Sequence, residues 1–187
     1  MLSEVSLPCA LERATDKFLP HLRGLLRKLG KPYRTAITSK FKRLWEIYRR
    51  VATSMSHYKD NVASSTKYKA QMSPEITRST LQKCRKAARL IVVALCVPWK
   101  RVDIGNADEV MRKVTTFAVR FAFFLSEVRF IPGEQRKIAS AVTAACANRG
   151  HFFSERQESH LAFCCGTLAE YCWLTTEESI GQYLESL

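Results

Sequence analysis

Apolar residues recur three and four positions apart along most of this chain, which is the spacing of one face of an α-helix. The pattern predicts helices over residues 17–29, 38–51, 73–97, 106–132, 134–148, 154–173 and 175–187. Ser, Thr and Asn stand at several expected starts, and Pro or Gly stands at several expected ends. Residues 56–75 are polar and predict a loop or a weak helix. The chain is therefore expected to be all-α, an antiparallel bundle of six to seven helices.

Residues 17–29 predict a basic amphipathic helix. Its apolar face consists of Phe18, Leu22, Leu25, Leu26 and Leu29, and its polar side carries Arg23, Arg27 and Lys28. A helix of this kind lies on a membrane or on a partner, or it packs on its own domain, which is the commoner arrangement. Pro20 weakens the first turn.

Residues 106–132 place a cation beside an apolar stretch. Residues 117–125 are apolar nearly all round, which is typical of a helix at the centre of a bundle. Arg112, Val119 and Phe123 follow one another at steps of seven and four, so they share a face. Arg112 is then either an arginine at the mouth of an apolar cavity or a helix-end cation that reaches solvent. Residues 134–148 are mostly small, and they allow either a close helix contact or an unfilled space.

The composition indicates one helical domain. A chain of 187 residues fits a single domain, and its 7 Gly and 6 Pro leave long uninterrupted segments. No apolar run reaches the roughly 18–20 residues of a membrane span. The 7 cysteines are odd in number and no apolar leader opens the chain, so we expect reduced thiols in a cytosolic protein.

Positive charge is concentrated in the first half of the chain. Residues 1–101 carry 22 Lys/Arg and 6 Asp/Glu, whereas residues 102–187 carry 8 and 11. This split favours a polyanionic partner, either an anionic membrane surface or a nucleic acid. The basic half also holds aromatic residues on which single strands can stack, without any nucleic-acid-binding motif. These are Trp45, Tyr48, Tyr58 and Tyr68.

The sequence shows no catalytic motif. A phosphate-binding loop, a dinucleotide fingerprint and a nucleophile elbow are all absent from it, so an enzyme is not expected. Four residues that ligate metals elsewhere lack the paired spacing of a structural zinc site, and no metal or cofactor is expected. They are Cys146, His151, His160 and Cys164.

Three arginines follow one another along residues 73–97. Arg78, Arg85 and Arg89 are separated by seven and four positions, so they share one stripe of the expected helix. Such a stripe is usually a solvated face. Its alternative interpretation is a site for an anion, because guanidinium groups bind phosphates and carboxylates through paired hydrogen bonds.

The order of these features is distinctive. A basic amphipathic helix precedes a long helix ending in Ile-Val-Val-Ala-Leu; a short loop, a capped helix, a helix of small residues and two closing helices follow. The most specific part is residues 106–130, NADEVMRKVTTFAVRFAFFLSEVRF, with its acidic start and early arginine. Over roughly residues 38–187 this order resembles the TNF-α-induced protein 8-like (TIPE) family.

The resemblance implies a single all-α domain over residues 33–187, built around a hydrophobic cavity and preceded by a basic amphipathic extension over residues 1–32. Members of the family bind phospholipids with the acyl chains inside the cavity and the phosphoinositide headgroup at a basic mouth. They are described as phosphoinositide transfer proteins that influence inflammation, cell survival and migration. The resemblance thus implies a cytoplasmic protein that associates peripherally with anionic membranes.

The resemblance also assigns residues to this site. Arg112 takes the position of the main headgroup arginine, and Lys42 and Arg43 take those of a lysine pair. A second family arginine has no clear counterpart, and Lys100 or Arg101 is its substitute. The implied cavity lining is Val119, Phe123 and Phe124, with Ala141 and Ala145 opposite. The alternative expectation is a basic helical nucleic-acid-binding protein without a cavity, and a third is an adaptor whose helices pack on a partner.

Overall fold

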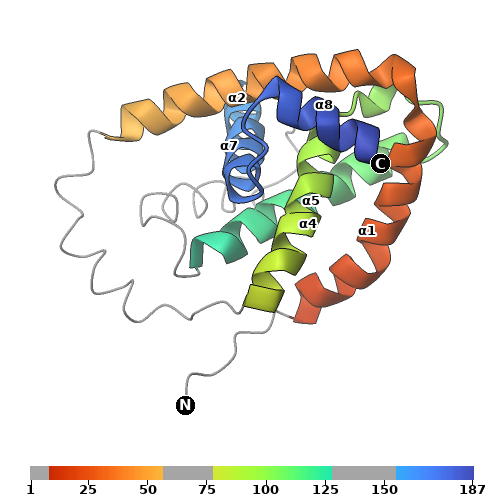
Figure 1. Cartoon of the computed structure of the whole chain (residues 1–187), viewed down its shortest axis with the longest axis horizontal. Coiled ribbons are helices and arrows are strands. Elements are labelled where there is room, and N and C mark those ends of the chain that lie inside the picture. Colours follow the sequence, from red (N-terminus) through yellow and green to blue (C-terminus); the bar gives the residue numbers. More distant parts are fainter. Residues whose placement is uncertain (1–8, 57–77, 128–154) are drawn as a thin grey trace.

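The computed structural model describes residues 9–56, 78–127 and 155–187, and these residues are helical with no strand among them. The helices are α1 (Cys9–Leu29), α2 (Arg34–Ser56), α4 (Arg78–Cys96), α5 (Ala107–Glu127), α7 (Glu155–Tyr171) and α8 (Glu177–Ser186), with short 3-10 turns η1 (Lys31–Tyr33) and η2 (Trp99–Arg101). They pack together, which confirms the predicted all-α class. In Figure 1, α2 runs along the top of the view, and α4 and α5 lie below it.

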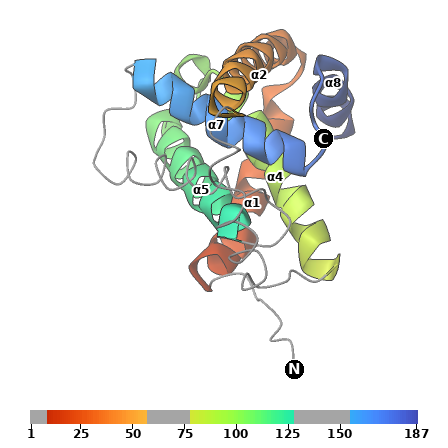
Figure 2. The same cartoon turned by 90° about the vertical axis from the view of Figure 1, so that its left-hand side faces the viewer.

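Helix α7 is the centre of the packing. It contacts α2, α4 and α5, and Figure 2 shows it running between them. Every residue from Ala162 to Ala169 is buried, as expected of a helix covered on several sides. Gly166 allows the close approach of α2, because a Cβ at this position would overlap the ring of Tyr48. The core therefore depends on a missing side chain as well as on large apolar ones.

Helix α1 belongs to the same core. Leu19, Leu22 and Leu26 are buried, and α1 contacts α4 and α5. The ring of Phe18 lies 6.3 Å from that of Phe117 on α5, measured between centroids. The apolar face predicted for residues 17–29 thus packs on other helices of the described part of the chain.

Helix boundaries agree with the sequence expectations where a cap is local. Thr176 caps α8, since its Oγ1 accepts a hydrogen bond of 3.1 Å from the Ser179 N–H. The Asn106 carbonyl accepts the first bond of α5, from the Val110 N–H at 3.0 Å. The start expected at Thr38 or Ser39 is wrong. Helix α2 begins at Arg34, and the Thr38 hydroxyl bonds back to the Arg34 carbonyl inside the helix.

Several parts of the expected architecture lie outside the described residues. They are the helix of small residues over 134–148, the end of the helix expected over 106–132, most of the loop or weak helix at 56–75, and the first turn of the helix expected over 73–97. Six packed helices are therefore described, while a seventh helix and the hydrophobic cavity expected beside it stay predictions. Among the described helices, none combines the length and apolar character that crossing a bilayer requires.

Candidate anion-binding sites

Arg112 lies on the outer side of α5, where its side chain is exposed. Its neighbours are charged: Lys113 Nζ lies 2.7 Å from Glu109 Oε1. The hydrogen bond and charge of Lys113, with a smaller effect of Arg112, lower the pKa of Glu109. Val119, seven residues further along, is buried. Arg112 is thus exposed to solvent in the second turn of α5, and it is open to a ligand from outside.

The expected cavity lining is described only in part. Val119 and Phe124 are buried and belong to the core cluster. The side chain of Phe123 lies outside the described residues, and so do Ala141 and Ala145. The structure therefore brings two of these five residues into one apolar core and does not test the wall expected opposite them.

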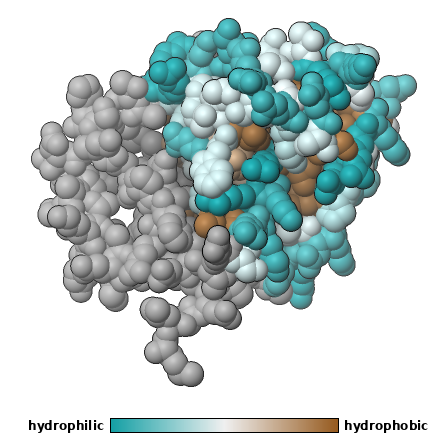
Figure 3. All heavy atoms as spheres, in the orientation of Figure 1, coloured by the Kyte–Doolittle hydropathy of each residue, from teal (hydrophilic) through white to brown (hydrophobic). Residues whose placement is uncertain are grey.

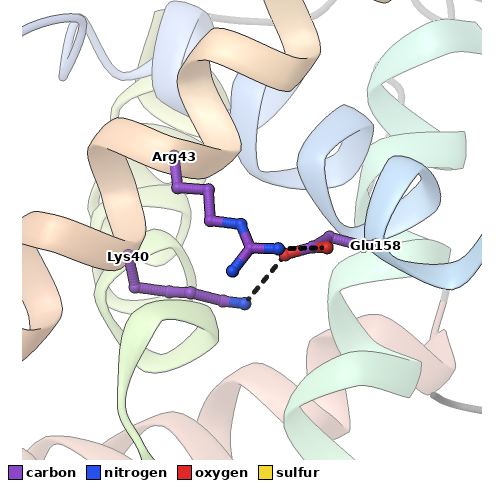
Figure 4. A network of polar contacts seen from close by, with 3 residues as sticks. All are labelled: Lys40, Arg43 and Glu158. Carbon is purple, nitrogen blue, oxygen red and sulfur yellow. Dashed lines mark hydrogen bonds and ion pairs between the residues drawn. The ribbon is translucent and has the colours of Figure 1, made fainter. Parts of the chain in front are cut away.

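The cations expected on α2 have partners within the protein. Arg43 Nη2 lies 2.8 Å from Glu158 Oε2 on α7, and Lys40 Nζ lies 3.3 Å from the other oxygen of the same carboxylate. Figure 4 shows the two cations converging on Glu158. Lys42 Nζ lies 3.4 Å from Glu177 Oε1 at the start of α8. These pairs connect α2 to α7 and α8, so a lipid headgroup at Lys42 and Arg43 competes with internal carboxylates.

Lys100 and Arg101 form part of η2, between α4 and α5, and both are exposed. The Tyr33 hydroxyl donates a hydrogen bond of 3.3 Å to the Arg101 carbonyl, so η2 lies against η1. Lys31 on η1 is also exposed. The two short turns therefore bring positive residues from distant parts of the chain to one edge of the molecule.

A small pocket lies where α1, α2 and α8 meet. Its volume is about 80 Å³, and its apolar lining comes from Leu26, Leu29, Ile37 and Leu184. Arg27 is at its edge and donates from Nε to the Leu187 carbonyl at 2.9 Å. This volume has room for only a few water molecules. None of the residues expected to line a lipid cavity borders it.

The arginine stripe on α4 is the least expected arrangement. Arg85 and Arg89 are half-buried, and the Nε atom of each is buried without a hydrogen-bond partner. The side chain of Arg78 lies outside the described residues. Among the residues that the structure describes, neither Arg85 nor Arg89 takes part in an ion pair. Buried donors are normally satisfied, so two unpaired ones a single turn apart need an explanation.

The turn after α7 covers these arginines. The guanidinium of Arg85 stacks on Trp173, with Cζ 3.8 Å from the ring centroid. The Trp173 side chain is 62% exposed, and its φ of 63° is in the left-handed region. The N–H groups of Trp173 and Leu174 bond to the carbonyls of Glu170 and Ala169, as in a Schellman motif. Glycine is the usual residue at this position, because a side chain there is strained.

Two tyrosines lie beside the same arginines. The Tyr171 hydroxyl is buried without a partner, and burial, with a further effect of Cys84, raises its pKa. Burial also raises the pKa of Tyr183 to about 12, while Arg23 and Arg89 act in the opposite direction. We call Arg85, Arg89, Tyr171 and Trp173 the arginine–tryptophan cluster. The sequence pattern indicated the arginines, whereas nothing in it marked Trp173 as more than the end of a helix.

Five cysteines of the described residues lie in the core. Cys84, Cys96, Cys164, Cys165 and Cys172 are free thiols and buried, which confirms that they act as small apolar residues. Burial raises the pKa of Cys84 and of Cys172 to about 12. Within the described ranges no cluster has the ligands for a metal ion, and Cys146 and His151 lie outside those ranges.

Comparisons with known proteins leave the sequence and the geometry as the basis for interpretation. No protein-family model, curated protein or solved structure matches this chain. The resemblance to the TIPE family therefore stays a prediction from the order of sequence features.

Proposed function

We propose that this protein binds anionic phospholipids, phosphoinositides among them, at the surface of a membrane, and that it carries or transfers them. The observation that carries this proposal is the charge of the outer surface of α1, η1 and α2. Exposed residues between Leu11 and Arg50 include ten Lys/Arg and three Asp/Glu. The cations are Arg13, Lys17, Arg23, Arg27, Lys28, Lys31, Lys42, Arg43, Arg49 and Arg50.

This surface suits an anionic leaflet because its charge lies outside while its apolar residues are buried. Each Lys or Arg close to an anionic bilayer contributes about 1 kcal/mol to binding. Four or five of these cations facing a leaflet at once therefore supply a binding energy of roughly 4–5 kcal/mol without any inserted helix. Figure 3 shows hydrophilic residues over much of one face of the described part, with hydrophobic patches between them.

The acyl chains are the second half of the proposal. Val119 and Phe124 are buried on α5, and we place the chains beside them, with Phe123, Ala141 and Ala145 completing the lining. The pocket near Leu26 is bordered by none of these residues. Arg112, exposed about two helical turns before Val119 on α5, is the proposed contact for the headgroup.

The packing of Tyr48 on α2 favours a lipid over a single-stranded nucleic acid as the ligand. Tyr48 is buried, and its ring lies 5.3 Å from that of Trp45 and 5.7 Å from that of Phe163. The Tyr48 hydroxyl donates to Glu170 at 2.7 Å. An aromatic ring used in this way cannot stack on bases, so Tyr48 does not offer the platform that single-strand binding needs, and Tyr58 and Tyr68 lie outside the described residues.

The first test is native mass spectrometry, with lipid extraction, of protein purified through a high-salt wash. Under the proposal a phospholipid or fatty acid remains bound, because an acyl chain sheltered by the protein is insensitive to salt. A protein without lipid that binds an oligonucleotide tightly at low salt, and loses it steeply as salt rises, contradicts the proposal and supports a nucleic-acid function.

The second test addresses Arg112. We expect Arg112→Ala to lose binding to vesicles that contain phosphoinositide while keeping the helical circular dichroism spectrum of the wild type. Arg120→Ala is the matched control. Arg120 is also an exposed residue of α5, and its substitution removes the same charge. Equal binding by folded Arg112→Ala and Arg120→Ala removes Arg112 from the site.

A further inference from the structure

We infer that Arg85 and Arg89 form a binding site for a phosphate monoester, with Trp173 lying over it. The inference deepens the proposed function, because a phosphorylated lipid headgroup is one source of such a group and a soluble phosphate ester is the other. It does not depend on the residues assigned to the headgroup above. Its basis is the arginine–tryptophan cluster alone.

The first argument is the set of unused donors. The Nε atoms of Arg85 and Arg89 are buried without partners, and the two residues are one helical turn apart on the same side of α4. No carboxylate among the described residues pairs with either guanidinium. An oxyanion that accepts from both arginines satisfies these donors and supplies the missing counter-charge.

The second argument is the orientation of Arg85. Its guanidinium stacks on the Trp173 ring at 3.8 Å and so uses its face for this contact. The N–H donors lie in the plane of the guanidinium, so stacking leaves them available for an oxyanion. The same contact restricts the side chain and lowers the entropy lost when a ligand binds.

The third argument is the residue at position 173. A large aromatic side chain occupies a left-handed position that glycine adopts without strain, and most of its surface faces solvent. Packing therefore does not account for Trp173. A role over the guanidinium of Arg85 does, because the ring holds this guanidinium in one orientation while its in-plane N–H donors are not used by the stacking contact.

The charge around the cluster selects the ligand class. Arg23 and Arg89 both oppose the rise in the pKa of Tyr183, so positive charge also acts on this neighbouring tyrosine. The Tyr171 hydroxyl is a further donor without a partner. A phosphate monoester carries about −1.5 to −2 charges near neutral pH and three acceptor oxygens, and it matches this excess of donors better than a carboxylate or a phosphodiester does.

The test compares two double variants of α4 with equal loss of charge. Arg85→Met/Arg89→Met removes the site, and Lys83→Met/Lys86→Met removes two exposed cations from the same helix. Both proteins and the wild type are titrated with inorganic phosphate by calorimetry and with phosphatidylcholine vesicles that contain either phosphatidic acid or phosphatidylglycerol. Circular dichroism reports whether each variant is folded.

We expect the arginine variant to bind phosphate at least tenfold more weakly than the wild type, and the lysine variant to bind it normally. Preference for phosphatidic acid over phosphatidylglycerol should disappear in the arginine variant alone, which identifies the lipid headgroup as the source. Loss of phosphate binding with unchanged vesicle binding supports a site for a soluble phosphate ester. A wild type that binds no phosphate, or a folded arginine variant that binds it as the wild type does, overturns the inference.

These outcomes separate the inference from the proposed function. If the wild type binds no anionic vesicle but binds phosphate through Arg85 and Arg89, the proposed function is contradicted and the inference is supported. A third variant, Arg85→Lys/Arg89→Lys, keeps both charges and removes the Nε donors. We expect it to bind phosphate more weakly than the wild type, and full binding by this variant would assign the effect to charge alone and overturn the role of these donors.

Discussion

The two ends of α7 hold cations in opposite ways. At its N-terminal end, Lys40 and Arg43 share the carboxylate of Glu158 at 3.3 and 2.8 Å. At its C-terminal end, Arg85 stacks on Trp173, and neither it nor Arg89 is paired with a carboxylate of the described residues. Lys40 and Arg43 connect α2 to α7 through ion pairs, whereas Arg85 and Arg89 keep Nε donors without a hydrogen-bond partner.

The comparison teaches that a count of basic residues is a poor guide to which of them bind a ligand. Glu158 lies in the first turn of α7, where the helix dipole favours a negative charge, and two cations of α2 add to it. The C-terminal end of a helix favours positive charge, so it tolerates Arg85 and Arg89 without a carboxylate. Where a helix dipole and an aromatic ring stabilise an arginine, its N–H donors are not used by a carboxylate and can bind a ligand.

The largest predicted effect comes from a substitution that disrupts the packing of α7 against α2. Gly166→Ala places a methyl group against the Tyr48 ring, whose hydroxyl is fixed to Glu170, and we expect a loss of about 3 kcal/mol in the free energy of unfolding. Urea unfolding measures it. Gly181→Ala is the control, since nothing lies within 4 Å of the added Cβ and helix propensity raises stability by roughly 0.5–1 kcal/mol. Equal effects of the two substitutions would contradict the close contact of α2 and α7.

The next effect concerns the shared carboxylate. Glu158→Gln removes the acceptor charge for Lys40 and Arg43, and we expect it to lower the free energy of unfolding by about 1 kcal/mol at low salt. The loss should shrink as salt rises, because both cations are partly exposed. Glu46→Gln, an exposed position on α2, serves as the control and should have little effect. A loss that does not vary with salt would point to packing instead of charge.

A smaller effect with the opposite sign is predicted at the other end of α7. Trp173→Gly relieves about 1–2 kcal/mol of left-handed strain and gives up roughly 0.5–1 kcal/mol of contact with Arg85, so we expect a net gain of about 0.5 kcal/mol. Trp173→Ala loses the contact and keeps the strain, so it should be less stable than the wild type. Thermal and urea unfolding of the pair check this. A glycine variant less stable than the wild type would mean that the Trp173 side chain contributes more by its contacts than its left-handed backbone costs.

The smallest predicted effect sharpens the comparison most directly. Arg43→Met gives up the bond to Glu158 and should cost about 0.5 kcal/mol in the free energy of unfolding. Arg89→Met removes an unpaired donor and should cost nothing within about 0.3 kcal/mol, because no protein acceptor is lost. Parallel urea titrations of the two variants measure the difference. A clear loss of stability in Arg89→Met would show that this arginine already has a partner within the protein.

Much of the fold was predictable because helix formation is local. The periodicity of apolar residues indicated the six α-helices that the structure describes, and the starts expected near residues 106 and 175 agree with those of α5 and α8. The start of α2 was missed, because threonine is a common N-cap residue and the sequence alone does not distinguish a cap from a threonine inside a helix. In the structure the Thr38 hydroxyl donates to the Arg34 carbonyl within α2. The length of α1 was underestimated, because Pro20 lies within that helix and the apolar pattern of residues 9–16 is weak.

The candidate sites were predictable only in composition. The arginine stripe of α4 was visible as a spacing, and the exposed position of Arg112 was one of two expected alternatives. Its relation to a cavity was not decided, since Ala141 and Ala145 lie outside the described residues. Neither Glu158 as the partner of Arg43 nor Trp173 as the partner of Arg85 had any signal in the sequence.

The sequence by itself determined that this protein is all-α, where most of its helices lie and that its first half is basic, since each of these depends on neighbouring residues in the chain. Only the tertiary structure decided which cations are neutralised. Arg43 and Glu158 are 115 positions apart, and they meet because α2 crosses α7 at Gly166. Arg85 meets Trp173 because α7 ends in a turn beside α4. Such pairings follow from how helices cross, which depends on the packing of all of them together.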